Sequence, residues 1–339
     1  MANFNNTILS GAIWEASREF AGLESRTQGY GAIQLMLANQ KRFPEIGRLA
    51  SAGQRPASIQ LDSFTPTTAG TSISCSPVSA NGDSVNTALT WQTISNVVTI
   101  SEARATENLK TTQEQAKIDY ENALAGMHDK LETEILSFIN TNRSGYSIAK
   151  TGLSTWVSAG SANYNSIALA RKDHIRSTIK SEMRAAKYRG NMNLLISSPY
   201  DEYLYHTGIQ GTNNSENMQD QLSGFNTFIT DNASTVSSTY GGIYAVPVGG
   251  VMMFIYVEPR YLKGSTNSKG VWSSTPDPKF GFNLGMFTKE DCADTTARGG
   301  GPQDNVSVTE FHFQVAFATP TLTSPSLETV IHKYALATT

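Results

Sequence analysis

The sequence is short of charge, of cysteine and of long apolar runs. Charged residues make up 16% of its 339 residues, whereas about a quarter is usual for globular domains. Lys plus Arg total 26 and Asp plus Glu total 29, a net charge of -3. The whole molecule therefore has no electrostatic bias toward nucleic acid, and any such contact must be local. Ser, Thr, Asn, Gln and Gly take the place of charge, which is typical of a surface that other molecules cover.

The scarcity of cysteine argues against a disulfide-rich secreted protein, and the scarcity of apolar runs argues against a membrane-spanning one. Cys75 and Cys292 form neither a disulfide framework nor a metal-ligand spacing, so we expect free thiols in a reducing compartment. The N-terminus lacks the charged region and unbroken apolar core of a signal peptide. The most apolar run, residues 246–257, is too short to span a membrane and contains a turn-like Gly249-Gly250 pair. We expect a buried strand there and no membrane contact.

Site motifs with a known mechanism are also absent. The sequence has no phosphate-binding loop, no nucleophile elbow, no paired-histidine zinc motif and no C-x-x-C pair. Its five histidines are scattered, and each, His128 included, reads as a surface or strand residue rather than a ligand. Solvated charge or capping explains the acidic pairs Glu132/Glu134 and Asp201/Glu202 better than acid-base chemistry does. We expect no enzyme, no metal and no cofactor, although a catalytic triad needs no local motif.

The N-terminal third divides into a helical arm and a β excursion. Helical spacing of apolar residues over 8–20, a weaker stripe through Ile33 and Leu37, and Pro44 as a stop predict an N-terminal helical arm, residues 1–47. Residues 48–100 are rich in Thr, Ser, Val and Ile and predict an extended hairpin with flanking strands.

The tip of this hairpin is the first candidate contact site. Its residues are Ala80, Asn81, Gly82 and Asp83, of which the Asn-Gly pair suits a tight turn. The hairpin has too few apolar residues for a core of its own, and isolated hairpins are marginal in water. We expect it to rest on this chain or on another copy.

A very long helix follows, within a predicted segment of residues 101–165. Ser101 is the expected N-cap and Glu102 suits the first turn of a helix of roughly 40 residues, about 60 Å long. Its C-terminal half carries apolar residues at three- and four-residue steps, whereas its N-terminal half is mostly polar. That pattern favours a helix lying over a surface or against neighbouring subunits, and the steps do not keep the heptad of a coiled coil.

The rest of the sequence predicts an α/β layer over residues 166–300 and a closing β segment over 301–339. Residues 142–166 read as a boundary. A helix with Ile175, Ile179 and Met183 on one face and a left-handed cap at Gly190 is followed by a buried strand and a new helix capped by Ser198. Two strands are expected around Gly249-Gly250. Alternating aromatic and apolar residues from Phe311 to Phe317 predict the last long strand.

A basic cluster on the predicted helix is the second candidate site. Its members are Arg171, Lys172, Arg176, Lys180, Arg184, Lys187 and Arg189. One interpretation is contact with nucleic-acid phosphate or an acidic neighbour. The other is a solvated face opposite the apolar one.

The order of these elements resembles the major capsid proteins of tailed bacteriophages, which share the HK97-like fold. The resemblance rests on "ALTWQTISNVVTISEARA", "IRSTIKSEMRAAKYRGNMNLLISSPYDEYL" and "FHFQVAFATPTL", and covers roughly residue 48 to the C-terminus. It implies an α+β fold with an N-terminal arm, an extended β-hairpin called the E-loop, a spine helix in a peripheral domain, and an α/β axial domain.

The same resemblance implies an icosahedral shell of hexamers and pentamers around double-stranded DNA. Portal and scaffolding or cement proteins would be further partners, and the protein would be made in the host cytoplasm. No lysine lies between Lys41 and Lys110, so E-loop cross-linking through lysine is not expected. Three alternatives remain open at this point: an encapsulin-like compartment holding protein cargo, an enzyme without a readable motif, and a tail or adhesion protein.

Overall fold

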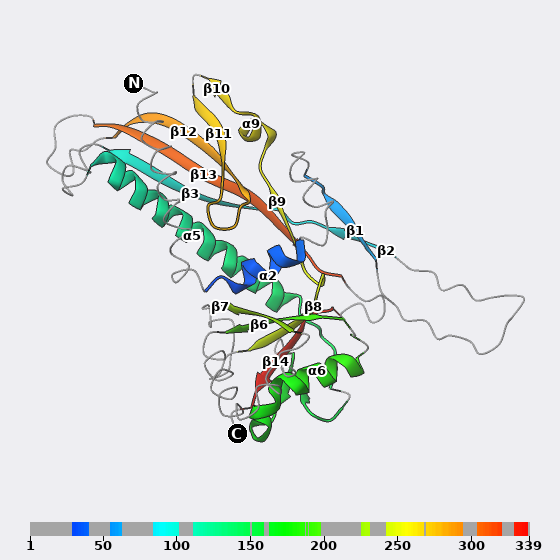
Figure 1. The fold of residues 1–339 in the computed structure, drawn as a ribbon. Coiled ribbons are helices and arrows are strands. Elements are labelled where there is room, and N and C mark those ends of the chain that lie inside the picture. Colours follow the sequence, from blue (N-terminus) through cyan, green and yellow to red (C-terminus); the bar gives the residue numbers. More distant parts are fainter. Residues whose placement is uncertain are drawn as a thin grey trace, which may run out of the picture.

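The protein is an elongated α+β molecule in which two β-sheets lie one beyond the other (Figure 1), and the predicted α+β class is confirmed. This computed structural model describes residues 29–40, 55–62, 84–101, 111–149, 151–158, 163–186, 188, 190–197, 225–230, 242–267, 269–293, 304–320 and 329–337.

The first sheet has six strands, and every pairing within it is antiparallel. Its main path runs β10-β11-β12-β13-β3, with β9 also paired to β13. The strands are β3 (Gln92–Ser101), β9 (Met252–Tyr256), β10 (Ser265–Asn267), β11 (Gly270–Pro276), β12 (Asn283–Ala293) and β13 (Asp304–Ala318). A short helix, α9 (Pro259–Lys263), connects β9 to β10.

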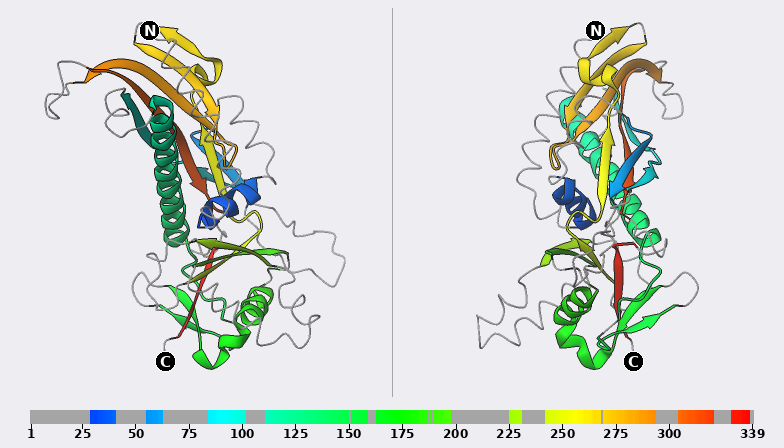
Figure 2. Two further views of the ribbon diagram at one scale, coloured as in Figure 1. Left: turned by 60° about the vertical axis from the view of Figure 1, so that its left-hand side comes forward. Right: turned by 90° about the vertical axis from the view of Figure 1, so that its right-hand side faces the viewer.

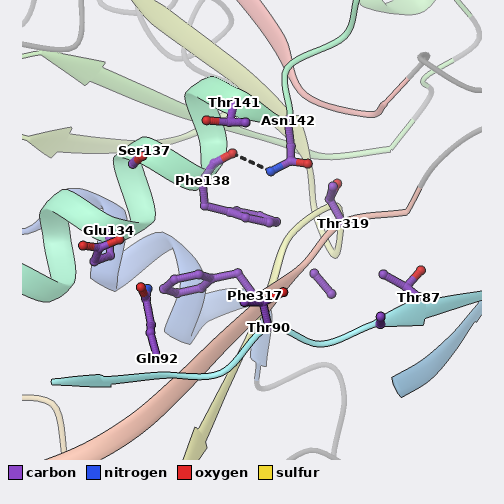
Figure 3. A pocket seen from close by; sticks show the side chains of 12 residues that line it. Thr87, Thr90, Gln92, Glu134, Ser137, Phe138, Thr141, Asn142, Phe317 and Thr319 are labelled. Carbon is purple, nitrogen blue, oxygen red and sulfur yellow. Dashed lines mark hydrogen bonds between the residues drawn. The ribbon is translucent and has the colours of Figure 1, made fainter. Parts of the chain in front are cut away.

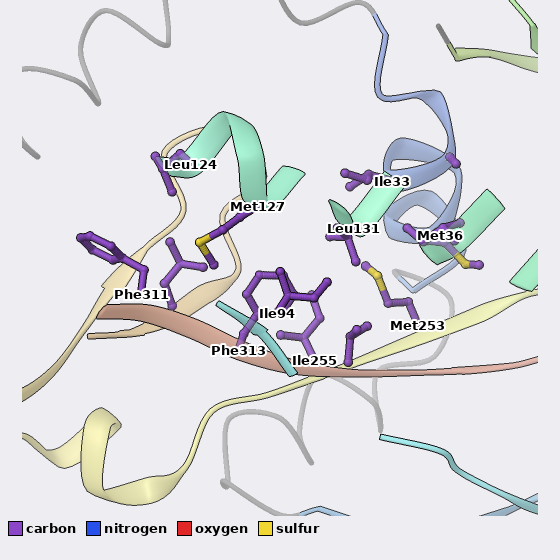
Figure 4. Close-up of a cluster of buried hydrophobic side chains, with 14 of the residues drawn as sticks. Ile33, Met36, Ile94, Leu124, Met127, Leu131, Met253, Ile255, Phe311 and Phe313 are labelled. Carbon is purple, nitrogen blue, oxygen red and sulfur yellow. The ribbon is translucent and has the colours of Figure 1, made fainter. Parts of the chain in front are cut away.

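The long helix α5 (Thr112–Thr141) lies along one face of this sheet (Figure 2). Its buried face meets the sheet in a core (Figure 4) that includes Leu124, Met127 and Leu131 of α5, Ile94 of β3, and Phe311 and Phe313 of β13. Alternation of large side chains along β13 creates the sheet's half of this contact, as the sequence predicted for Phe311 and Phe313.

The helix begins later than predicted. Ser101 ends β3 and pairs with Val306, so its predicted role as N-cap is wrong. The observed cap is Thr111, whose side chain accepts the Glu114 N–H at 3.2 Å while the Glu114 carboxylate accepts the Thr111 N–H at 2.8 Å. This capping box fixes the start of a helix of 30 residues, about 45 Å long.

The second sheet is mixed, in the order β4-β5-β14-β8-β6-β7. Its β14–β5 and β6–β7 pairs are parallel and the others are antiparallel. The strands are β4 (Thr155–Val157), β5 (Tyr164–Ile167), β6 (Met192–Ser197), β7 (Phe225–Thr230), β8 (Ile243–Pro247) and β14 (His332–Leu336).

Helix α6 (Ile175–Ala185) covers part of this sheet after a 3-10 turn, η2 (Leu169–His174). Ile175, Ile179 and Met183 pack into a second core with residues of β6, β8 and β14, so the predicted apolar face is confirmed. The predicted cap at Gly190 is wrong. The helix already ends at Ala185, its C-cap Ala186 has φ -81°, and Gly190 is not among the glycines with positive φ.

The chain passes between the sheets at the Gly249-Gly250 turn, where Gly249 has φ 87°. Both predicted strands exist there, but β8 belongs to the second sheet and β9 to the first. The predicted unit 166–300 is therefore divided, because β9 to β12 join the first sheet. The segment 301–339 is divided too, since β13 lies in the first sheet and β14 in the second. The predicted boundary region 142–166 contributes β4 and β5 to the second sheet.

Helix α2 (Gly31–Gln40) joins the two sheets. It is apolar, and most of its residues are buried, because it contacts α5 and β9 on one side and β6 and β7 on the other. Both ends are held by buried polar side chains. Glu132 accepts the N–H groups of Ala32 and Ile33 at 3.0 and 2.9 Å, and Asn39 accepts N–H groups of Asn193 and Gly249 at 3.0 and 3.1 Å. This part of the predicted arm is thus a central element; residues 1–28 and 41–47 lie outside the described residues.

Candidate assembly surfaces

The predicted hairpin is present where the structure describes it. β1 (Ser58–Asp62) and β2 (Ser84–Ala88) are antiparallel and form a sheet to which no other described strand is hydrogen-bonded. The predicted tip, residues 80–83, and the predicted new helix at Ser198 lie outside the described part of the chain.

Aromatic packing and hydrogen bonds fix the root of the hairpin to the first sheet. The Trp91 indole N–H donates to the Pro56 carbonyl at 2.9 Å. The Trp91 ring meets the Tyr256 ring of β9 edge-on, with the two centroids 6.0 Å apart. The Arg55 guanidinium lies over the same Trp91 ring, 5.4 Å from its centroid. One aromatic ring and one cation thus pack on a single tryptophan and hold the root in place.

The strands of the hairpin are partly buried on one side and exposed on the other. Ile59 and Leu61 are partly buried against a small cluster that includes Met252 and Phe254, whereas Ser58, Gln60 and Asn86 are exposed. One side of the two-stranded ribbon thus lacks a second layer among the described residues.

A recess of about 440 Å³ opens beside this root, between the C-terminal half of α5, the end of β13 and the start of β3 (Figure 3). The rings of Phe138 and Phe317 meet there with centroids 5.3 Å apart. Hydroxyl and amide groups make up most of the remaining lining: Thr87, Thr90, Gln92, Ser137, Thr141, Asn142 and Thr319. The one charged lining group, Glu134, is paired with Lys130 at 2.6 Å. Apart from Glu134, the lining is uncharged, and its mixture of polar and aromatic groups suits contact with another surface.

The predicted basic cluster is placed on η2 and α6. Lys172 and Arg184 are exposed, and Arg171, Arg176 and Lys180 are half-buried. Arg176 and Lys180 both interact with neighbouring groups. Lys187 and Arg189 lie outside the described residues. The described cations are thus divided between η2, with Arg171 and Lys172, and α6, with Arg176, Lys180 and Arg184. Their role stays a prediction.

Sequence reasoning missed the buried ionisable groups. His128 is neither a surface nor a strand residue: it lies buried in α5, with Nε2 2.7 Å from the Asp277 carboxylate at the end of β11. The other oxygen of Asp277 accepts the N–H groups of Lys279 and Phe280 at 2.9 and 2.7 Å. Burial lowers the pKa of Lys279 to about 8, an effect that the nearby carboxylates of Asp277, Glu132 and Asp129 partly offset. No local signal could reveal a pair separated by 149 residues.

A second buried carboxylate, Glu182, lies on the buried face of α6. Glu182 accepts the Thr151 hydroxyl at 2.8 Å and both the N–H and the hydroxyl of Ser154 at 3.2 and 3.1 Å. These contacts satisfy the charge and tie the loop before β4 to the helix. The described residues hold no group of three His, Cys, Asp or Glu side chains placed to bind a metal. None of the described helices is both long and apolar enough to cross a bilayer.

Solved phage structures are similar to this chain over most of its length. "Mycobacterium phage Che8" covers 85% of this chain and 87% of its own, with TM-score 0.48 and 7% identity. "Mycobacterium phage Adephagia" covers 84% and 87%, with TM-score 0.46 and 13% identity. "Capsid of Ralstonia phage GP4" covers 84% and 86%, with TM-score 0.42 and 11% identity. No family model and no curated protein matches the sequence. At TM-scores below 0.5 this likeness alone does not decide a family, so the assignment has to rest on the elements themselves.

Proposed function

We propose that this chain is a structural protein that self-assembles into the icosahedral head shell of a tailed phage and encloses its double-stranded DNA. It would have the HK97-like fold, with β1 and β2 as the E-loop and α5 as the spine helix. The first sheet with α5 would form the peripheral domain, and the second sheet with α6 the axial domain.

The observation that carries this proposal is the hairpin. Two strands without a third are marginal in water unless something packs on them. This ribbon is anchored at its root and packed on one side, but its other side is exposed. Its order in the chain also agrees with the sequence resemblance: hairpin, return strand β3, long helix, compact layer, and a long closing strand β13. A neighbouring copy is the natural source of the missing layer.

The partners follow from this role. Copies of the chain would meet in hexamers and pentamers, the DNA would be held without sequence preference, and a portal and a separate scaffolding or cement protein would complete the head. Because the predicted E-loop has no lysine, the contacts between copies would be noncovalent. A surface with little charge fits contacts on several sides, since burying charge is unfavourable unless it is paired.

Deleting the hairpin tip, residues 80–83, tests the proposal. We expect a folded subunit with an unchanged circular-dichroism spectrum, because the root contacts at Trp91 remain, together with a loss of closed shells in sedimentation velocity. The control is Lys269→Ser, at an exposed position outside the hairpin in the turn between β10 and β11, and it should assemble normally. Shells of normal size and yield from the deletion variant would contradict the E-loop assignment.

A further inference from the structure

Two cationic side chains, Arg143 and Lys333, lie where the C-terminus of α5 meets the second sheet, and neither has a carboxylate partner among the described residues. The Arg143 guanidinium is held by carbonyl acceptors: Nε donates to the Asn163 carbonyl at 3.0 Å, and Nη1 donates to the Asn140 side chain at 2.8 Å and also to its main-chain carbonyl. The Tyr244 hydroxyl donates to the same Asn140 side-chain oxygen at 3.0 Å. These bonds fix the guanidinium without neutralising its charge.

Lys333 brings a second positive charge to the same place. It lies on β14 directly opposite Tyr244 of β8, is 8% exposed, and has its ammonium 5.6 Å from the Tyr244 ring centroid. Among the described residues no hydrogen-bond acceptor or carboxylate partners this ammonium. Burial, and then repulsion by Arg143, lower the pKa of Lys333 to about 8. Lys279 has a similarly lowered pKa, but three carboxylates face it.

Both cations keep unused donors at the solvent boundary. Among the described residues, Arg143 Nη2 and Lys333 Nζ have no hydrogen-bond acceptor. Neither atom is fully buried. A buried cation without a counter-charge is unfavourable, and the cation–π contact with Tyr244 offsets part of that penalty. The remaining donors have no acceptor among the described residues, so they are available to an anion from another molecule.

We propose that Arg143 and Lys333 form a binding site for a carboxylate side chain presented by a second copy of this chain. This inference rests on the proposed shell. Lys333 is nearly covered, so only a slim group such as the end of an Asp or Glu side chain can reach its ammonium. A DNA phosphate is flanked by a sugar on each side and is a poorer fit. A carboxylate would accept charge-assisted hydrogen bonds from both cations.

Acetate tests the site on the unassembled subunit, without any assembly step. We expect the melting temperature of the wild type to be higher in sodium acetate than in sodium chloride of equal ionic strength at pH 7. Lys333→Met should abolish the difference, while the control Lys279→Met, which removes a lysine already faced by carboxylates, should keep it. An equal acetate effect in all three proteins, or none in the wild type, would overturn the site.

The identity of the natural anion is tested in the same subunit and in shells. A short DNA duplex should give no Lys333-dependent stabilisation, and such an effect would overturn the carboxylate assignment in favour of phosphate. Shells of Lys333→Met should dissociate at lower urea than wild-type shells. Equal dissociation would contradict the proposed contact between copies but not the proposed shell. A wild type that forms no shells would contradict the proposed function itself.

Discussion

Glu132 stabilises a helix to which it does not belong. Its two carboxylate oxygens accept the first free N–H groups of α2, at the positive end of that helix, and the side chain is 3% exposed. Hydrogen bonds to a buried charged group contribute more than neutral ones. This residue therefore links α5 to the helix between the two sheets.

Replacing Glu132 by Gln should destabilise the subunit by about 2 kcal/mol. The amide nitrogen of Gln is a donor, so it would face a main-chain N–H group from which it cannot accept a hydrogen bond. Urea denaturation of the unassembled chain measures the loss. Glu134→Gln is the matched control: it removes one half of a partly exposed pair with Lys130 and should change the unfolding free energy by under about 1 kcal/mol. Equal effects of the two substitutions would show that the contact to α2 is unimportant.

Gly31 is required by close packing rather than by backbone conformation. A Cβ at this position would lie 2.2 Å from the Ile229 carbonyl oxygen of β7, so α2 and the second sheet would have to separate. We expect Gly31→Ala to lower the unfolding free energy by about 3 kcal/mol despite the better helix propensity of alanine. Gly190→Ala, where an added Cβ meets nothing within 4 Å, should be close to neutral. A neutral Gly31→Ala would contradict the close approach of α2 and β7.

At the scale of elements, local patterns predicted what lies within one helix or strand. The apolar face of α6, the strands at β6, β8, β9 and β13, and the base of the hairpin follow from periodicity and turn residues. The start of α5 was wrong because Ser101 and Thr111 are both acceptable caps and pairing with Val306 decides for strand at Ser101. Sheet membership of β8 and β9 could not be predicted, because both are short apolar strands and pairing depends on distant residues.

The candidate sites also differ in whether the sequence could predict them, depending on how far apart their residues lie in the chain. The basic residues of α6 were visible as a run of like charge. Arg143 and Lys333 are far apart in the sequence and each looks ordinary there; only the fold brings them to one place. The pairing of His128 with Asp277 is hidden for the same reason.

The basic face of α6 gives a prediction at the scale of one helix. Joint substitution of Arg176, Lys180 and Arg184 by Gln should leave the subunit folded, since the buried face of α6 is formed by Ile175, Ile179 and Met183. If the face contacts phosphate, DNA retention in particles should fall and should become less sensitive to salt. The control is the same number of substitutions on exposed lysines at the other end of the molecule: Lys263 of α9, Lys269 between β10 and β11, and Lys289 of β12. Unchanged assembly and DNA retention in the α6 variant would reduce the cluster to a solvated face.

At the scale of the whole molecule, two hydrophobic cores are joined by α2 and by chain segments that cross between the sheets. The crossings after β8 and before β14 mean that neither sheet is built from one continuous stretch of sequence. The strands β1 and β2 form a separate two-stranded ribbon beside the first sheet (Figure 1). In the proposed shell, this ribbon and the long body would offer contacts to several neighbouring copies.

Negative-stain electron microscopy of the largest particle fraction, together with the ratio of absorbance at 260 and 280 nm, tests this account most directly. The fraction should be taken both from cells that make this chain alone and from its native source. The account predicts closed shells from both sources, with DNA inside the native particles. Closed shells filled with protein instead of DNA would point to a cargo compartment, and monomers or small oligomers from both sources would contradict the proposal that this chain builds a shell.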